Sequence, residues 1–488
     1  MNAQTQPSFV AFLRKNRVVL FVGTLVFLFV IGYSLSTLTT KPRIWTDESV
    51  SIELAKNFAD DGFLDVEFAP ERHTGFSYLL QSTGYPVTVP LGVLFHLFGF
   101  SFSLARLYML GWMLVVLVAL YLVGRRFFDP QLVLFSLLLV ATFASFYGSG
   151  RTVVGEIPGF FFLLIGLYFL FEKKSCAVAG IFLGLAVVTK PSVFGLLLPV
   201  LFIVLLLRPR RFFPRFVQLA VGMLPAALLW FPFVGVNPFA PQFFHTISSF
   251  YQNPYGSDIS TNVIQNVSGF FSSTTLLYFF VLFLLVVVAR FLSRRAQIAS
   301  LYDFVIIYSV IAFAYYLRSP GWLRYILIAE LLILFVLPHA IFITTHFFQK
   351  KVKVLGRVRV ASLTAGILLV FSVVQVVQLI YFSDIYTSSD AIKTAQILDN
   401  RFVGKRVAII NNADLYVLVK NPQREGLIEI VGIPQIGINP LLGNILPDVA
   451  VFIGRSDKFR TEAKTVLDTH YAFEEQLHGY DIFTLRDE

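Results

Sequence analysis

Long runs of apolar residues, separated by short polar segments, occupy most of the chain. A helix that crosses a bilayer needs about 20 mostly apolar residues, and eleven segments approach or meet this length. They lie at about Val18–Leu38, 103–124, 131–148, 155–171, 176–191, 193–208, 216–235, 274–292, 301–318, 323–345 and 359–382. The first segment is too long for the apolar region of a signal peptide and no small-x-small cleavage site follows it. The pattern predicts a polytopic α-helical membrane domain over residues 1–382.

The connection between the first two apolar segments, residues 39–102, is too long to be a simple loop. Its polar and apolar positions predict an amphipathic helix from Asp47 to Asp61, with Thr46 as the N-cap and Gly62 at the C-terminal end. The later stretch Val89–Phe100 is apolar but too short to span a bilayer. We expect it to form a helix that lies in the membrane interface.

A second long connection, residues 236–273, is rich in aromatic residues and asparagine, and the last part of the chain, 383–488, is soluble in composition. Helical periodicity at 388–400 and 457–469 alternates there with short β-branched runs. These runs are Arg406–Ile410, Leu427–Val431, Val449–Ile453 and Tyr480–Leu485. The alternation predicts a small C-terminal α/β domain.

Composition and charge agree with a membrane protein. Hydrophobic residues make up 56% of the chain and charged residues 14%, against about 25% charged residues in soluble domains. The net charge of +10 follows from loops that would lie on the cytoplasmic side, each of which is basic, whereas 236–273 contains no lysine or arginine. We therefore expect a plasma-membrane protein with a cytoplasmic N-terminus, an extracytoplasmic C-terminal domain and no nucleic-acid partner. The single cysteine, Cys176, permits no intrachain disulfide.

Two acidic residues, Asp47 and Glu48, follow the first apolar segment and fall in the first turn of the predicted amphipathic helix. Acids are common in such a turn because they complement the helix dipole. The same dipole keeps a carboxylate ionised near neutral pH, which suits a general base. Asp47 and Glu48 are therefore candidate catalytic residues.

Cationic residues recur at the predicted extracytoplasmic helix ends. A single lysine or arginine there is ordinarily a snorkelling interfacial residue, but recurrence at several turns runs against the positive-inside bias. Cations beside an acidic pair predict a site that binds a phosphate and deprotonates a hydroxyl. The candidate phosphate-binding residues are Arg106, Arg151, Lys190 and Arg324.

Glu330 lies six residues into the predicted span 323–345. An acidic side chain within a membrane span costs free energy, so we interpret Glu330 first as a functional residue. A structural role, in which it pairs with Arg324 or Lys190, is the alternative. The other candidate substrate-binding residues are Glu156, Tyr325 and His73.

The sequence contains no phosphate-binding loop, dinucleotide fingerprint, His-Glu-x-x-His sequence or cysteine cluster. No metal or cofactor is therefore indicated, although a divalent cation is compatible with the sequence. Nucleotide sugars are cytosolic, so an extracytoplasmic site needs another activated donor. A sugar linked to a polyprenyl phosphate, held in the lipid bilayer, meets that need.

Several short stretches, in their order along the chain, resemble the GT-C superfamily of membrane glycosyltransferases. The most similar branch contains the protein O-mannosyltransferases and the bacterial lipid A aminoarabinose transferase. The stretches are Asp47-Glu48, Tyr85-Pro86, Leu97-Phe98-Gly99, Ala105-Arg106-Leu107, Gly150-Arg151-Thr152, Glu156-Ile157-Pro158, Gly180, Gly184-Leu185, Thr189-Lys190-Pro191 and Arg324-Tyr325. The resemblance covers about residues 1–340 and implies a GT-C fold with about eleven transmembrane helices. The Trp-Trp-Asp-Tyr-Gly sequence of oligosaccharyltransferases is missing.

The resemblance also implies a function. Such a protein transfers a sugar, with inversion, from a polyprenyl-phosphate donor to a lipid, glycan or protein acceptor on the extracytoplasmic face. It implies that Asp47 is the base, that Glu48 assists acceptor placement, and that Arg151, Lys190 and Arg324 hold the lipid phosphate. Two alternatives stay open. A flippase or transporter for lipid-linked glycans would place its polar residues at the membrane midplane, and a non-catalytic assembly subunit would have a degenerate site.

Overall fold

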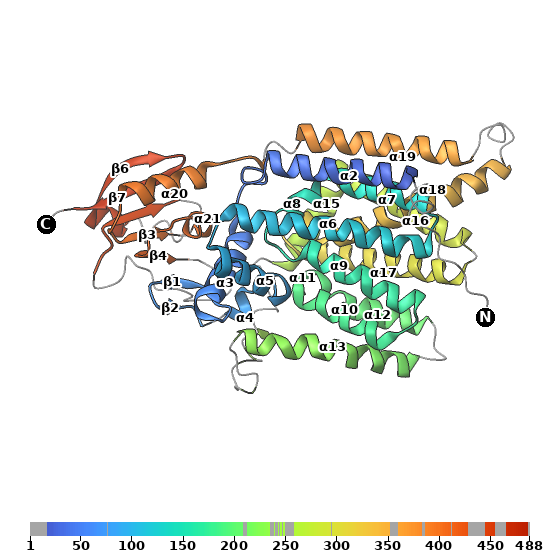
Figure 1. The fold of residues 1–488 in the computed structure, drawn as a ribbon, viewed down its shortest axis with the longest axis horizontal. Coiled ribbons are helices and arrows are strands. Elements are labelled where there is room, and N and C mark those ends of the chain that lie inside the picture. Colours follow the sequence, from blue (N-terminus) through green and yellow to red (C-terminus); the bar gives the residue numbers. More distant parts are fainter. Residues whose placement is uncertain are drawn as a thin grey trace.

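A computed structural model of the chain shows a bundle of helices with a small sheet domain at one end (Figure 1). The structure describes residues 17–75, 77–207, 212–234, 258–293, 295–351, 360–382, 386–410, 412–427, 445–453 and 465–486, together with a few residues between 239 and 248.

Each apolar segment predicted from the sequence overlaps a helix or a broken helix of the bundle. The helices are α2 (Arg17–Ser36), α6 (Phe102–Phe127), α7 (Pro130–Thr142), α8 (Ala144–Gly150), α9 (Glu156–Leu167) with the π-helical η1 (Tyr168–Glu172), α10 (Cys176–Thr189), α11 (Pro191–Phe194), α12 (Leu197–Leu206), α13 (Phe212–Val234), α16 (Thr274–Leu292), α17 (Ala296–Arg318), α18 (Leu327–Lys351) and α19 (Val360–Val377) with the π-helical η5 (Gln378–Phe382). Within the described residues, six helices are long and apolar enough to cross a membrane, and a seventh span is the pair α7–α8, which bends by 65°. The chain is a multi-pass membrane protein, as the sequence predicts.

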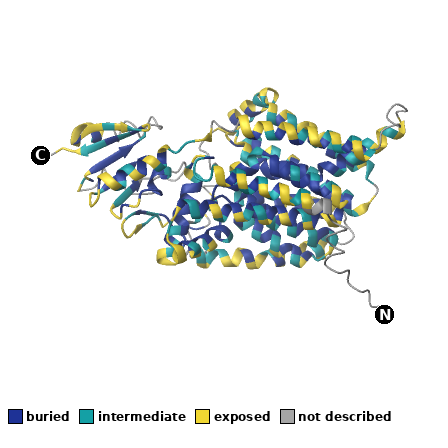
Figure 2. Cartoon of the chain, turned by 45° about the horizontal axis from the view of Figure 1, so that its top comes forward, coloured by how far each residue is buried: buried dark blue, intermediate teal, exposed yellow. Residues whose placement is uncertain are grey.

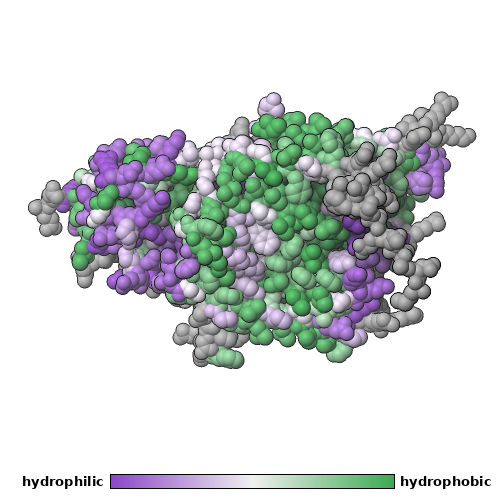
Figure 3. Space-filling model, viewed as in Figure 1, coloured by the Kyte–Doolittle hydropathy of each residue, from purple (hydrophilic) through white to green (hydrophobic). Residues whose placement is uncertain are grey.

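Of the six candidate spans among the described residues, α18 is the most enclosed, with 83% of its apolar window buried. It packs against α7, α16 and α19, and the buried residues gather where the helices face one another (Figure 2). Apolar side chains also cover the visible outer face of the bundle, whereas the sheet domain is mostly hydrophilic (Figure 3). An apolar surface of this kind is stable only in contact with lipid.

The connection after α2 folds into a compact unit against the bundle. It contains α3 (Thr46–Asp61), the hairpin of β1 (Glu67–Ala69) and β2 (Arg72–His73), the short α4 (Ser77–Leu80), and α5 (Tyr85–Phe98). Helix α3 begins at Thr46, so Trp45 rather than Thr46 is the N-cap, and Trp45 makes no side-chain capping bond. Gly62 closes α3 with a φ of 81°, as predicted.

Helix α5 begins four residues before the predicted Val89, because Pro86 occupies its first turn, where proline needs no hydrogen-bond partner. It packs against α3, while Leu97 and Phe98 at its end stay exposed. In the second long connection, α15 (Ile259–Ser272) precedes α16, and most of 236–257 lies outside the described residues.

The C-terminal domain is a five-stranded sheet with the order β4-β3-β5-β7-β6. Strand β3 is parallel to β4 and β5, whereas β7 is antiparallel to its neighbours β5 and β6. The elements are α20 (Asp390–Arg401), β3 (Val407–Ile410), α21 (Ala413–Tyr416), β4 (Arg424–Leu427), β5 (Val449–Phe452), β6 (Tyr471–Leu477) and β7 (Tyr480–Leu485). The predicted strand Leu427–Val431 and helix 457–469 lie largely outside the described residues, and β6 was not predicted.

The C-terminal domain is joined to the unit around α3 by polar contacts. The Arg424 guanidinium on β4 donates to the Glu53 carboxylate on α3 at 2.8 Å and lies over the Tyr416 ring. The Tyr416 hydroxyl donates to the backbone oxygen of Glu67 at 2.8 Å. Glu53 also pairs with Lys56 at 2.9 Å. Both partners of the Arg424–Glu53 pair are largely buried. The C-terminal domain therefore supports α3 on one side, and the helix bundle supports it on the other.

Candidate active site

The N-terminus of α3 directs two adjacent carboxylates to different places. Asp47 and Glu48 both lie in its first turn, and successive residues of an α-helix point about 100° apart. The Asp47 side chain is 26% exposed, whereas the Glu48 side chain is completely buried. Of the two acids, Asp47 is therefore the one that a substrate can reach.

Asp47 meets the two cations that the sequence placed at neighbouring helix ends. Its Oδ2 accepts a hydrogen bond from Nη1 of Arg324 at 2.5 Å and lies 4.0 Å from Nζ of Lys190. The three residues come from α3, from the 3₁₀ turn η3 (Leu323–Tyr325) and from the end of α10. Residues far apart in the chain thus form one charged cluster, with a carboxylate facing two cations.

Aromatic rings surround the Arg324 guanidinium. Its central carbon lies 4.8 Å from the ring centre of Trp45, 4.6 Å from that of Trp322 and 5.5 Å from that of Tyr325, distances at which a cation is attracted to ring faces. Burial disfavours its charge, but Asp47 and Tyr325 hold the pKa of Arg324 above its ordinary value. The rings therefore fix the direction of a permanent cation.

Lys190 is held by the backbone around it. It caps the C-terminal end of α10 and precedes the short helix α11, and its side chain is only 2% exposed. Two glycines contact this turn: the Gly84 amide donates to the Thr189 oxygen at 2.9 Å, and a Cβ on Gly155 would lie 2.2 Å from the same oxygen. Only residues without a side chain allow both segments to approach so closely.

Besides Asp47, a second carboxylate, that of Glu156, lies near the Lys190 ammonium. Its Oε1 lies 3.8 Å from Nζ of Lys190, and its Oε2 has no hydrogen-bond partner among the described residues. At 4.0 Å and 3.8 Å, the Asp47 and Glu156 carboxylates are both too distant from the Lys190 ammonium for a hydrogen bond. Within the described part of the chain, the ammonium therefore keeps its donors for another group.

Glu48 and Arg106 form a completely buried ion pair beneath this cluster. Nη2 of Arg106 donates to Oε2 of Glu48 at 2.6 Å, and the Val153 amide donates to Oε1 at 3.3 Å. Burial raises the pKa of Glu48 to about 7, while Arg106 acts in the opposite direction. Neither side chain has any exposed surface. Acceptor placement by Glu48 and phosphate binding by Arg106 stay predictions.

Arg151 follows α8 and is also buried. Its Nη1 donates to the Thr37 hydroxyl at 2.5 Å, and its guanidinium lies 5.4 Å from the Tyr33 ring and 5.7 Å from the Tyr147 ring. The structure thus joins Arg151 to the end of α2 and not to Asp47. A role in holding phosphate stays a prediction for this residue.

Tyr325, His73 and Glu330 have different surroundings. Tyr325 lies in the cluster, beside Trp322 and Arg324. His73 contacts the opposite end of α3, with Nε2 2.7 Å from Asn57 and 3.2 Å from Asp61.

Glu330 lies apart from the cluster. Helix α18 begins at Leu327, four residues later than expected, so Glu330 lies in its first turn. It borders a largely apolar cavity whose lining includes six phenylalanines. Among the described ion pairs it joins neither Arg324 nor Lys190.

The sequence analysis missed Trp45 and Trp322, which complete the aromatic surroundings of Arg324. Both stand within two residues of a candidate, in Trp45-Thr46-Asp47 and Trp322-Leu323-Arg324. Tryptophan is the best partner for a cation, so these short spacings were an available signal. The described residues contain no group of three His, Cys, Asp or Glu side chains that could hold a metal ion.

Comparison with known proteins identifies the fold. Residues 90–235 match the family model of dolichyl-phosphate-mannose-protein mannosyltransferase, and no curated protein matches the chain in sequence. The structure is similar to ArnT from Cupriavidus metallidurans bound to undecaprenyl phosphate, with a TM-score of 0.59 and 15% identity over 96% of this chain and 98% of that one. It is also similar to the apo oligosaccharyltransferase of Archaeoglobus fulgidus, with a TM-score of 0.58 and 12% identity over 94% of this chain and 69% of that one. The predicted GT-C fold and the resemblance to this superfamily are confirmed.

Proposed function

We propose that this chain, which has the fold of the GT-C glycosyltransferases, transfers a sugar from a polyprenyl-phosphate donor to an acceptor hydroxyl. The observation that carries the proposal is the meeting of Asp47 with Arg324 at 2.5 Å and Lys190 at 4.0 Å. A carboxylate and two cations at one point supply the two charges that the reaction requires. The carboxylate receives a proton, and the cations stabilise a leaving phosphate.

The reaction is a single displacement. The acceptor oxygen forms a bond to C1 of the donor sugar while the bond between C1 and the phosphate oxygen breaks. The electron pair of that bond leaves with the phosphate, and the acceptor proton passes to the Asp47 carboxylate. Because the acceptor attacks the face opposite the leaving group, the configuration at C1 inverts.

Arg324 and Lys190 are the proposed donor-binding residues. A lipid phosphate would replace Asp47 as the partner of Arg324, which frees the carboxylate to accept the acceptor proton. Two observations support a lipid-linked donor: the apolar surface of the helix bundle, and the bound undecaprenyl phosphate named for the ArnT structure. The two fixed cations neutralise charge in the way a divalent ion does in other transferases.

We place the reaction on the extracytoplasmic side of a plasma membrane. The support is the distribution of lysine and arginine, which favours a cytoplasmic N-terminus. The cluster lies at the ends of α10 and α17 that precede Lys190 and η3, and the C-terminal domain contacts the same unit.

The proposal is tested with purified protein in detergent and a panel of radiolabelled polyprenyl-phosphate sugars. Wild-type protein is expected to release or transfer the sugar of one donor. Asp47→Asn is expected to lower kcat by about 10²–10⁴-fold, the usual contribution of a positioned base. Asp60→Asn is the matched control, because Asp60 is an exposed acid at the other end of the same helix. Normal turnover by Asp47→Asn would remove Asp47 from this role, and no turnover of any donor by wild type would refute the proposed activity.

A further inference from the structure

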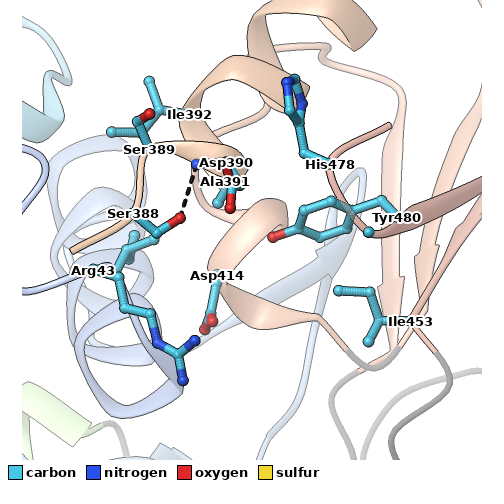
Figure 4. Close-up of a pocket in the computed structure, with 12 residues that line it drawn as sticks. Arg43, Ser388, Ser389, Asp390, Ala391, Ile392, Asp414, Ile453, His478 and Tyr480 are labelled. Carbon is cyan, nitrogen blue, oxygen red and sulfur yellow. Dashed lines mark hydrogen bonds between the residues drawn. The ribbon is translucent and has the colours of Figure 1, made fainter. Parts of the chain in front are cut away.

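A cavity of about 270 Å³ lies between the C-terminal domain and the segment that leads into α3. Figure 4 shows its lining, with the Arg43 side chain extending toward Asp414 and with His478 and Tyr480 on the opposite side. Asp390, at the start of α20, borders the cavity as well. The volume is near the lower end of ligand pockets, which measure about 300–1,000 Å³.

The walls of this cavity are fixed by backbone hydrogen bonds. The Arg43 amide donates to the Tyr386 oxygen at 2.6 Å, and the Ser388 amide donates to the Thr40 oxygen at 3.0 Å. The Ser388 hydroxyl accepts a hydrogen bond from the amide of Asp390, the first residue of α20, at 3.1 Å (Figure 4). The segment before α3 is thus joined to the C-terminal domain, and the cavity is preformed between them.

The cavity lies close to the candidate active site. Ile44, which lines it, precedes the N-cap Trp45 of α3 by one residue. Asp414, another lining residue, lies in α21, which packs against α3. The donor-binding cations Lys190 and Arg324 come from the helix bundle, whereas this cavity is built largely by the C-terminal domain. It is therefore placed to hold the second substrate.

The lining determines which chemistry fits. Asp390 and Asp414 accept hydrogen bonds and repel anions, so the cavity does not suit a free phosphate. Arg43 and His478 add donors, and the Tyr480 ring adds an apolar face. A neutral polyol with one apolar face satisfies all of these groups, and a sugar ring is such a ligand.

We propose that this cavity binds a saccharide of the acceptor, so that the acceptor is a glycan or glycolipid. This inference rests on the proposed glycosyl transfer and names the class of its second substrate. A hydroxyl of the bound saccharide then attacks C1 of the donor sugar. The C1–phosphate bond breaks, its electron pair leaves with the phosphate, and the proton of that hydroxyl passes to Asp47.

The test measures saccharide binding to the full-length protein in detergent, without donor. The probes are methyl glycosides of hexoses, N-acetylhexosamines and pentoses, and binding is followed by saturation-transfer NMR. We expect at least one of them to bind wild-type protein, and Asp390→Asn and Asp414→Asn each to weaken it by about tenfold or more, because hydrogen bonds to charged groups are the strong ones. Asp481→Asn is the matched control, since Asp481 follows Tyr480 on β7 and its side chain points to the other face of the sheet.

The outcomes separate the two proposals. Absence of binding by every glycoside, or equal binding by wild type and both cavity variants, would overturn the saccharide site. Glycoside binding that Asp390→Asn weakens supports it, whether or not the donor panel is turned over. Failure of the donor panel alone would refute the proposed transfer and leave a saccharide site without that reaction.

Discussion

The backbone approaches closely at Gly155 in the candidate active site, and filling this position tests how Lys190 is positioned. Gly155 has a φ of −83°, which alanine adopts without strain. A Cβ there would nevertheless lie 2.2 Å from the Thr189 oxygen and 2.9 Å from the Lys190 Cβ. The effect of Gly155→Ala is therefore steric and falls on the turn that carries the cation.

The size of the effect follows from these distances. The Thr189 oxygen must retreat by about 1.2 Å from 2.2 Å to reach the 3.4 Å of ordinary contact. That oxygen is backbone and also accepts the Gly84 amide, so Lys190 must move with it. A misplacement of about 1 Å costs roughly 10²-fold in rate, and overpacking costs about 1–3 kcal/mol of stability.

The assay is kcat/KM for sugar release from the donor, together with the apparent Tm of the purified protein. Gly155→Ala is expected to lower kcat/KM by about 10²-fold while the protein stays folded. Gly148→Ala is the matched control, because a Cβ on this nearby glycine of α8 meets nothing within 4 Å. Wild-type kinetics for a folded Gly155→Ala protein would refute the idea that this turn sets the position of Lys190.

Three other predictions concern charge and topology. Lys190→Ala should raise the Kd for a polyprenyl-phosphate donor by about tenfold or more in equilibrium binding, because it removes a charged partner of the phosphate; unchanged affinity would exclude a phosphate contact. Glu48→Gln should cost about 3–5 kcal/mol of stability, because it leaves Arg106 buried without its partner, and the double variant with Arg106→Met should regain most of the lost Tm; additive losses would contradict this. In a Cys176→Ala background, Lys405→Cys should react with an impermeant maleimide in intact cells and Lys174→Cys only after lysis, and the reverse result would invert the topology.

The bundle was predictable because each apolar run must become a helix in lipid, where every backbone polar group needs an internal partner. The meeting of Asp47, Lys190 and Arg324 could also be predicted from topology, since charged residues at helix ends on the same side of a membrane lie at one surface of the bundle. Buried pairs between distant segments of the chain could not be predicted. Arg106 and Glu48 are 58 residues apart, and no local pattern shows that burial pairs them with each other.

Errors at element ends had larger consequences. The start of α18 was placed at 323, but residues 323–325 form the turn that carries Arg324, and the helix begins at Leu327. A shift of four residues rotates the side chains by about 40° and moves them by about 6 Å along the axis. Glu330 lies in the first turn of α18 and borders the largely apolar cavity, and among the described ion pairs it joins neither cation of the cluster. The strand β6 was missed because most of its side chains are exposed, so apolar alternation is weak.

The contact between Arg424 and Glu53 gives the order of synthesis a functional meaning. The two residues are 371 positions apart, so the ribosome makes α3 long before its partner exists. Until β4 emerges from the ribosome and docks, Lys56 is the partner that neutralises Glu53. During that time α3, which carries Asp47, lacks its contact with the C-terminal domain. The membrane part of a nascent chain can thus be inserted and packed while its reaction centre is still incomplete. Under the proposed function, competence would arrive only after β4 has been translated and has docked, so that shorter nascent chains would not consume the lipid-linked donor.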